Sequence, residues 1–207
     1  MKKSMLVGLL LVCSSGASWA MGGDIQKGQA VAGSICMACH GIDGISPIPT
    51  QPHLAAQIPE YIEKQLHDMK SVNGAPPERN NPVMSGIVMM LSDDDMRNVA
   101  AWYASRPPKI FQTITPEHVP VGESLWRAGD KDRGVPACAG CHGPTGSGIP
   151  VRYPRLSGQY QQYTETQLLN FRNGTRHNDP AGVMRSIAGR LSVDEIKALA
   201  DFTAGLH

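Results

Sequence analysis

The 207-residue sequence lacks the features that mark membrane-spanning, β-sheet and nucleic-acid-binding proteins. Its apolar run from Met5 to Val12 is too short to span a bilayer comfortably, and no other segment is long enough. Alternation of β-branched residues with a period of two is nearly absent, which favours an all-α fold. No basic run contains interleaved aromatic residues, and only 5% of the residues are aromatic, so nucleic-acid binding has no support.

Cysteine is also scarce, with five residues in the chain, and Cys13 lies in a predicted signal peptide, residues 1–20. Two lysines precede the apolar run, and residues 18–20 form a small-x-small cleavage site. The mature protein would begin near Met21 and keep four cysteines, all of them in two short motifs that leave none for a disulfide. This pattern predicts export to the periplasm.

Two alternatives stay open for the N-terminal segment. Cys13 is a candidate for lipidation, although Val12 stands where a small residue is expected. An uncleaved membrane anchor is the other, although the apolar run is short for one. The mature chain has no predicted transmembrane segment, and peripheral membrane association stays open.

The pattern Cys-x-x-Cys-His, which attaches c-type haem, occurs twice, at residues 36–40 and 138–142. Residues i, i+3 and i+4 share one face of a helical turn, so two thiols and an imidazole can reach one porphyrin. The thiols add to the vinyl groups and the imidazole binds the iron. We therefore predict two covalently bound haem c groups. The predicted attachment residues are Cys36, Cys39, Cys138 and Cys141, and the proximal iron ligands are His40 and His142.

A zinc ribbon and a disulfide redox site also use Cys-x-x-Cys pairs. The two pairs of a ribbon lie roughly 15 to 20 residues apart, whereas these two are separated by about the length of a domain. A thioredoxin-like site needs strands alternating with helices around it, and no strand pattern flanks either motif. Both alternatives are therefore disfavoured.

The two motifs belong to an internal duplication. The halves align at an offset of 102 residues, which becomes 100 after a two-residue difference between Leu66 and Asn73. We predict two domains, residues 21–104 and 120–207, joined by a proline-rich linker, residues 105–119. Matched positions include Leu54 with Leu156, Gln57 with Gln159, Tyr61 with Tyr163, Gln65 with Gln167 and Met84 with Met184.

Each half is predicted to be mostly helical. Ser92 and Ser192 begin sequences like a capping box, followed by apolar residues at helical spacing, which predicts a terminal helix in each half. Domains of about 85 residues with few aromatic residues have small cores, so bound haem is expected to supply much of the buried apolar area. Further helices are expected over residues 24–35, 59–70, 122–128 and 161–171.

The sixth position of each iron decides whether a haem binds external ligands, because an axial methionine closes the site and raises the reduction potential. After the second motif, Met184 is the one methionine, and His177 and His207 are the other candidates. The first half has several methionines, among which the repeat selects Met84. We predict Met84 and Met184 as axial ligands. For Met96, and for Met89 or Met90, a position in the core is favoured.

Proline and leucine follow each haem motif after about a dozen residues, at Pro52 and Leu54 and at Pro154 and Leu156. With the two haem motifs, they make the whole mature chain resemble the cytochrome c4 family of periplasmic dihaem cytochromes with two class-I cytochrome c domains. The resemblance implies that the carbonyl group of each proline accepts a hydrogen bond from the ligating imidazole. Alternatively, the two prolines are ordinary loop residues, which would occupy the same positions without forming that hydrogen bond. Candidates for binding the haem propionates are Arg79, Arg176, Tyr61 and Tyr163.

The resemblance also implies a function. A carrier of this family takes electrons from a quinol-oxidising membrane complex and passes them to a terminal oxidase or a periplasmic reductase, and it is not an enzyme. The alternative is a dihaem peroxidase, a sulfur-compound oxidoreductase or the cytochrome subunit of one, which needs an accessible iron or an unusual axial ligand. A haem-based sensor is a weaker possibility, because no segment is left over for an output domain.

The two halves differ in charge and in length. Residues 21–104 contain five Lys or Arg and nine Asp or Glu, a net charge of −4, whereas residues 105–207 contain twelve and nine, a net charge of +3. Opposite charges can dock the domains on each other or orient the protein towards charged partners, and an ordinary solvated surface explains them equally well. The segment from Gly122 to the second motif is longer than that from Gly28 to the first, which predicts unequal haem environments.

Overall fold

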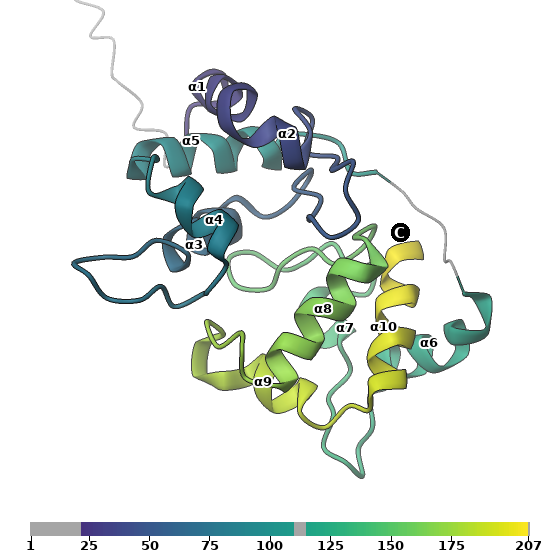
Figure 1. Cartoon of the computed structure of the whole chain (residues 1–207). Helices are drawn as coiled ribbons and strands as arrows, with labels where there is room; N and C mark the ends of the chain where they lie inside the picture. The colour runs from purple at the N-terminus through teal and green to yellow at the C-terminus, as the bar shows by residue number, and fades with distance from the viewer. Residues whose placement is uncertain (1–21, 110–114, 207) are drawn as a thin grey trace, which may run out of the picture.

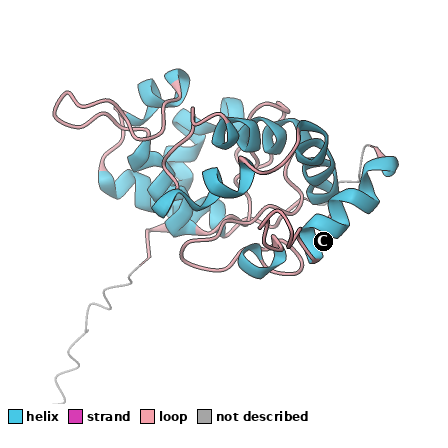
Figure 2. Ribbon diagram, turned by 90° about the horizontal axis from the view of Figure 1, so that it is seen from below, coloured by secondary structure: helices cyan, strands magenta, loops and turns pink. Residues whose placement is uncertain are grey.

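The computed structural model describes residues 22–109 and 115–206; the predicted signal peptide, residues 1–20, lies outside this part of the chain. The described residues form helices and loops, with isolated β-bridges but no strand, which confirms the all-α prediction (Figure 2). None of the helices in these residues is both long and apolar enough to cross a membrane.

The first half folds around its terminal helix, α5, which packs against α1 and α3 (Figure 1). Helices α1 and α5 cross closely at Gly28, since a Cβ atom there would lie 2.0 Å from the carbonyl oxygen of Asn98. Trp102 and Tyr103 of α5 are buried in the core of this half. The helical elements are α1 (Ile25–Val31), the π-helical η1 (Ala32–Cys36), α2 (Met37–His40), α3 (Pro59–Asp68), α4 (Pro82–Val88) and α5 (Asp93–Ala104).

The second half repeats this arrangement around α10, which packs against α6 and α8. Gly122 allows the close crossing here, since a Cβ atom on it would lie 2.4 Å from the carbonyl oxygen of Ala198. Helix α6 begins three residues before its predicted start, because Pro120 fits the first turn of a helix. The elements are η2 (Pro116–His118), α6 (Val119–Arg127), α7 (Ala139–His142), α8 (Gln161–Arg172), η3 (Pro180–Gly182), α9 (Val183–Ala188) and α10 (Val193–Gly205).

Both predicted capping boxes are present at the starts of the terminal helices. The hydroxyl oxygen of Ser92 accepts a hydrogen bond from the backbone N–H of Asp95 at 3.1 Å, and the Asp95 carboxylate accepts from the Ser92 N–H at 3.1 Å. Ser192 and Glu195 form the same pair at 3.2 and 2.8 Å. These side chains satisfy backbone donors that a helix start leaves unpaired, which fixes where α5 and α10 begin.

The methionines between α4 and α5 differ in part from expectation. Met96 is fully buried, as predicted. Met89 and Met90 are 56% and 63% exposed, so the prediction that one of them lies in the core is wrong. The chain turns between the two helices, and the residues on either side, Val88 and Leu91, take the buried positions.

The longer segment before the second haem motif forms a small hairpin, which the first half does not have. Asp130 and Val135 pair across it by two backbone hydrogen bonds of 2.7 Å. Arg133 at its tip donates to the carboxylates of Asp130 and Glu195. The hairpin therefore ties the end of α6 to the start of α10, and the surroundings of the two motifs are unequal, as predicted.

The two halves lie against each other and exchange hydrogen bonds in a nearly symmetric way (Figure 1). The side-chain amide of Gln57 donates to the carbonyl oxygen of Arg155 at 3.0 Å and accepts from its N–H at 2.8 Å. Gln159 makes the same two contacts with the backbone of His53, at 3.1 and 2.9 Å. Both glutamines are buried, so each fixes the proline-containing loop of the opposite half.

His53 is buried in this contact. Its Nδ1 accepts a hydrogen bond from the N–H of Ser46 at 3.0 Å, and its ring lies 4.2 Å from the ring of Tyr160. Burial, and secondly the positive charge of Lys109, lower the pKa of His53 to about 4 against the opposing effect of Asp43. His53 is therefore neutral in the folded protein at pH 7.

We predict that His53 makes the protein less stable in mild acid. Unfolded histidine titrates near pH 6.5, so between pH 6.5 and 4 the unfolded state binds a proton that the folded state does not. The free energy of unfolding therefore decreases as the pH is lowered through this range. For His53 the decrease is about 2 kcal/mol after allowance for solvent screening. Denaturant titrations of the holoprotein across this range, compared with those of His53→Gln, measure the contribution. The exposed His67→Gln variant serves as the control, and equal pH slopes for wild type and His53→Gln would refute the prediction.

Candidate functional site

Each Cys-x-x-Cys-His motif occupies a helical turn, at α2 and at α7. The four described cysteines are free thiols and are half-buried. Burial raises the pKa of Cys36 and of Cys138 to about 11, so both are neutral thiols at pH 7. The described residues contain no group of three or more His, Cys, Asp or Glu suited to a metal ion. Each motif places two thiols and one imidazole on a helical turn, the set that haem attachment uses.

The two motif histidines are held in the same way in both halves. His40 donates from Nδ1 to the carbonyl oxygen of Pro52 at 2.9 Å, and His142 donates to that of Pro154 at the same distance. Both rings are buried, which lowers their pKa values despite the opposing effect of the proline carbonyl groups. Each imidazole is therefore neutral at pH 7 and keeps Nε2 available for a metal. The hydrogen bonds implied by the resemblance are present in both halves.

The two predicted axial methionines lie in the first turns of equivalent short helices, α4 and α9. Both side chains are half-buried. Met84 packs against the apolar cluster that Cys36 also contacts. The side chain of Asn81 accepts a hydrogen bond from the Met84 N–H at 3.1 Å, which fixes the start of α4. Of the competing candidates, Met69 is buried in the core and His177 is exposed, while His207 lies outside the described residues.

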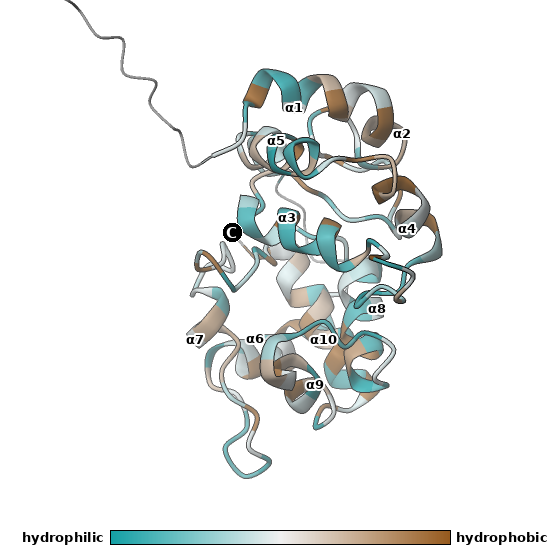
Figure 3. Ribbon diagram, turned by 90° about the vertical axis from the view of Figure 1, so that its left-hand side faces the viewer, coloured by the Kyte–Doolittle hydropathy of each residue, from teal (hydrophilic) through white to brown (hydrophobic). Residues whose placement is uncertain are grey.

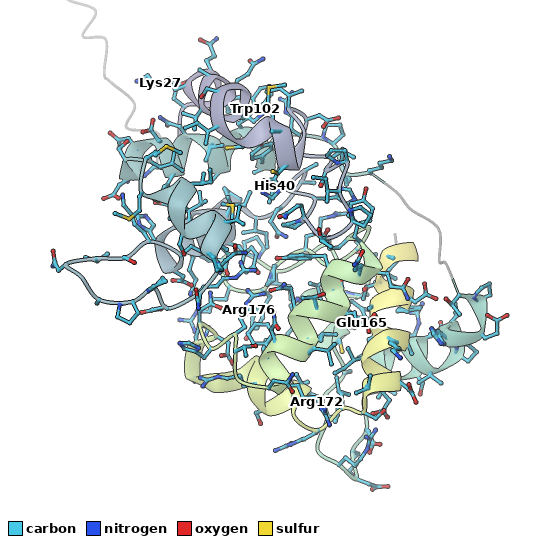
Figure 4. The ribbon with its side chains drawn as sticks, in the orientation of Figure 1. Lys27, His40, Trp102, Glu165, Arg172 and Arg176 are labelled. Carbon is cyan, nitrogen blue, oxygen red and sulfur yellow. The ribbon has the colours of Figure 1, made fainter. Side chains whose placement is uncertain are left out.

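Between the halves, the structure brings together all four predicted propionate-binding candidates. Arg79 donates to Tyr163 at 3.0 Å, and Arg176 donates to Tyr61 at 3.0 Å, so each arginine reaches a tyrosine of the other half. Figure 4 shows Arg176 at the boundary between the halves, with His40 inside the first half. Sequence reasoning missed further members of this cluster, whose only signal was the repeated glutamine. These are Gln65, Gln167 and Asn178.

The charge of this cluster favours an anion. Arg79 and Arg176 are each 7% exposed, and every hydrogen bond that their guanidinium groups donate among the described residues goes to an amide or a phenol oxygen. Buried charges require a counterion. Haem propionates would supply one at the place where the halves meet. The residues present therefore fit haem in three respects: free thiols, neutral histidines and buried arginines whose guanidinium groups donate to neutral oxygens.

Comparison with known proteins identifies the family of the chain. The family model described as Cytochrome c matches the chain twice, over residues 25–106 and 128–206. Cytochrome c4 of Thiocapsa roseopersicina is 45% identical over 186 residues, which cover 89% of this chain and 93% of that protein. The chain belongs to the cytochrome c4 family.

A solved structure supports the same assignment. Reduced recombinant cytochrome c4 from Pseudomonas stutzeri superimposes with a TM-score of 0.83 at 39% sequence identity, covering 89% of this chain and all of that one. A further relative, the thiosulfate dehydrogenase electron acceptor of Stutzerimonas stutzeri (strain A1501), is 39% identical over 184 residues, which cover 87% of this chain and 83% of that protein.

Membership of the family confirms several expectations from the sequence. The chain consists of two cytochrome c domains, and it is an electron-transfer protein rather than an enzyme. Its cofactors are two haem c groups, whose covalent attachment the two Cys-x-x-Cys-His motifs fit. The two matches of the family model show that the cytochrome c unit is duplicated in this chain.

The arginine cluster generates a prediction about reduction potential. Replacing Arg176 by Gln removes a buried positive charge beside the expected propionates, which favours the oxidised form. We expect at least one midpoint potential to fall by about 60 mV, a tenfold change for one electron. Spectroelectrochemical titration measures it. The exposed Arg172→Gln variant is the control, and unchanged potentials in Arg176→Gln would contradict the role given to this cluster.

Haem dependence of folding is a second prediction. The buried apolar clusters around α5 and α10 are small, so much of the buried apolar area in each half is expected to come from its haem. We therefore expect the chain without attached haem to be largely unfolded. Far-ultraviolet circular dichroism of the apo-chain and holoprotein compares them directly. A fully helical apo-chain would show that the polypeptide folds without its cofactors.

Proposed function

We propose that this dihaem cytochrome is a periplasmic electron carrier in which each haem is bound by one histidine and one methionine. His40 and Met84 hold the first, and His142 and Met184 hold the second. The observation that carries the proposal is the pair of buried, neutral imidazoles whose Nδ1 atoms are bound to proline carbonyl groups at 2.9 Å. When bound, each haem supplies a one-electron centre that alternates between ferric and ferrous iron.

The protein side chains suit a carrier more than a catalyst. The proline carbonyl groups hold both imidazoles in one orientation and tautomer, so each Nε2 stays aimed at its ligand position. Methionines on α4 and α9 would close the opposite side of each site to oxygen and peroxide. Little rearrangement is needed on electron transfer when both ligands are held by the fold. Cys36, Cys39, Cys138 and Cys141 would keep the haem groups attached throughout.

For the electron donor and acceptor of this carrier we propose only the class of enzyme. We infer a quinol-oxidising membrane complex as donor and a terminal oxidase or periplasmic reductase as acceptor, with residues 1–20 directing export to the periplasm. The net charges of −4 and +3 of the two halves would orient partners at different ends of the molecule. Ionic-strength dependence of the electron-transfer rate tests such steering.

A second donor is favoured by one specific likeness. The chain is 39% identical to a thiosulfate dehydrogenase electron acceptor, so a periplasmic enzyme that oxidises a sulfur compound is a candidate donor. Stopped-flow reduction of the oxidised protein by a thiosulfate dehydrogenase, compared with reduction by a quinol-oxidising complex, distinguishes the two. The faster reaction at equal concentrations identifies the preferred donor.

We predict that Met84 and Met184 are the axial ligands. Replacing either one by Ala should remove about half of the methionine-to-iron charge-transfer band of the oxidised protein, because each residue would serve one of two haem groups. Met96→Leu, at a fully buried core position, is the control and should leave the band intact.

The same variants separate carrier from enzyme. The reduced wild-type protein should bind carbon monoxide only slowly, because a methionine must first leave its iron, whereas each methionine variant should bind it rapidly at one site. Retention of the full band in both single variants would show that the ligand assignment is wrong. Rapid carbon monoxide binding by the wild type would favour the enzymatic alternative.

A further inference from the structure

One contact between the halves has no counterpart in the duplication. On α3 of the first half, Lys64 and Asp68 form an ion pair one turn apart. Lys64 also donates to the carbonyl oxygen of Asn178 at 3.0 Å, and the Asn178 amide donates to the Asp68 carboxylate at 2.5 Å. We call these three residues the clasp. Figure 3 shows α3, largely hydrophilic, at the boundary between the halves.

The clasp acts on the loop that leads to the proposed axial ligand of the second haem. Asn178 lies six residues before Met184. The next residue, Asp179, has a side chain that is 3% exposed and accepts hydrogen bonds from the Arg185 N–H at 3.0 Å and from its guanidinium group at 2.8 Å. The segment that contains Met184 is therefore fastened to the first half at its beginning and to itself at its end.

This loop has a stronger need for outside support than its counterpart. It is longer by two residues than the segment between Asn80 and Met84. Ala181 and Gly182 both have left-handed backbone conformations, with φ values of 55° and 69°. Such a conformation is unfavourable for alanine and needs the surrounding structure to maintain it.

The first half has no equivalent clasp. Asn80 stands two residues before Pro82, as Asn178 stands two residues before Pro180. Asn80 is exposed, and no hydrogen bond among the described residues joins it to the second half. The positions on α8 that align with Lys64 and Asp68 are occupied by Thr166 and Asn170, which bond within their own half. The backbone supports this alignment, because Arg79 donates its N–H to Asp68 and Arg176 donates its N–H to Asn170.

We propose that Lys64 and Asp68 are positioning residues for Met184, so that iron ligation in the second domain depends on a side-chain pair of the first domain. The inference rests on the ligand role proposed for Met184. The Asp68 side chain is 10% exposed, and its contacts involve a cation and an amide, so they are stronger than ordinary surface pairs. Ligation of the first haem by Met84 has no such dependence.

The test measures how often each axial methionine leaves its iron. Carbon monoxide binds to a reduced haem only while the methionine is released, so the binding rate reports the open fraction. In Asp68→Ala we expect the rate at the second haem to rise about tenfold, the effect of losing one charged hydrogen bond. Its charge-transfer band should weaken. The Met84→Ala background isolates the band of the second site.

Matched variants separate positioning from general stability. Asn80→Ala and Asn170→Ala, at the equivalent positions, should leave both binding rates unchanged. Asp68→Asn, which keeps an acceptor for Asn178, should stay within about twofold of the wild-type rate. Lower thermal stability of Asp68→Ala with unchanged binding rate and band at the second haem would overturn the inference and leave only a structural role.

The proposed ligand role is checked separately. Met184→Ala removes half of the band if Met184 is a ligand, whatever the clasp does. If the band survives in Met184→Ala, the ligand assignment fails. If Met184→Ala removes half of the band while Asp68→Ala matches the wild type, the ligand assignment stands and the positioning inference fails.

Discussion

The positive charge buried between the two halves constrains the rest of the structure. Arg79 and Arg176 lie at the boundary with neutral hydrogen-bond partners. The Asp68 carboxylate offsets part of this charge, and further anions at the boundary would stabilise the rest. Haem c carries two propionates, which would supply such anions beside these arginines. Attachment of haem and docking of the halves would then stabilise each other.

The crosswise pattern explains why the duplicated halves form one unit. Arg79 is completed by Tyr163, and Arg176 by Tyr61, so each half supplies what the other lacks. A separated half would leave its arginine with fewer partners and expose the loop that the opposite glutamine now holds. The boundary between the domains is therefore built from residues of both halves. A substitution in one half at this boundary also changes the hydrogen bonds of the other half.

Local chemistry explains which parts the sequence could predict. The haem motifs, the capping boxes at Ser92 and Ser192 and the proline hydrogen bonds all depend on residues close in sequence or on a family pattern. The arginine cluster was recognised only as a group of candidates, because contacts about a hundred residues apart leave no periodic signal. The wrong placement of Met89 or Met90 has a similar cause, since hydrophobicity alone does not show where a chain turns.

Duplication makes the differences between the halves more informative than their likeness. The motifs, prolines and methionines match, so they cannot make the two redox sites distinct. What differs lies outside them, in the hairpin closed by Arg133 and in the contact of Asn178 with α3. Both lie in the second half, one before its haem motif and one before Met184. The second half is thus the one with added contacts near its proposed haem ligands, and one of these contacts comes from the first half.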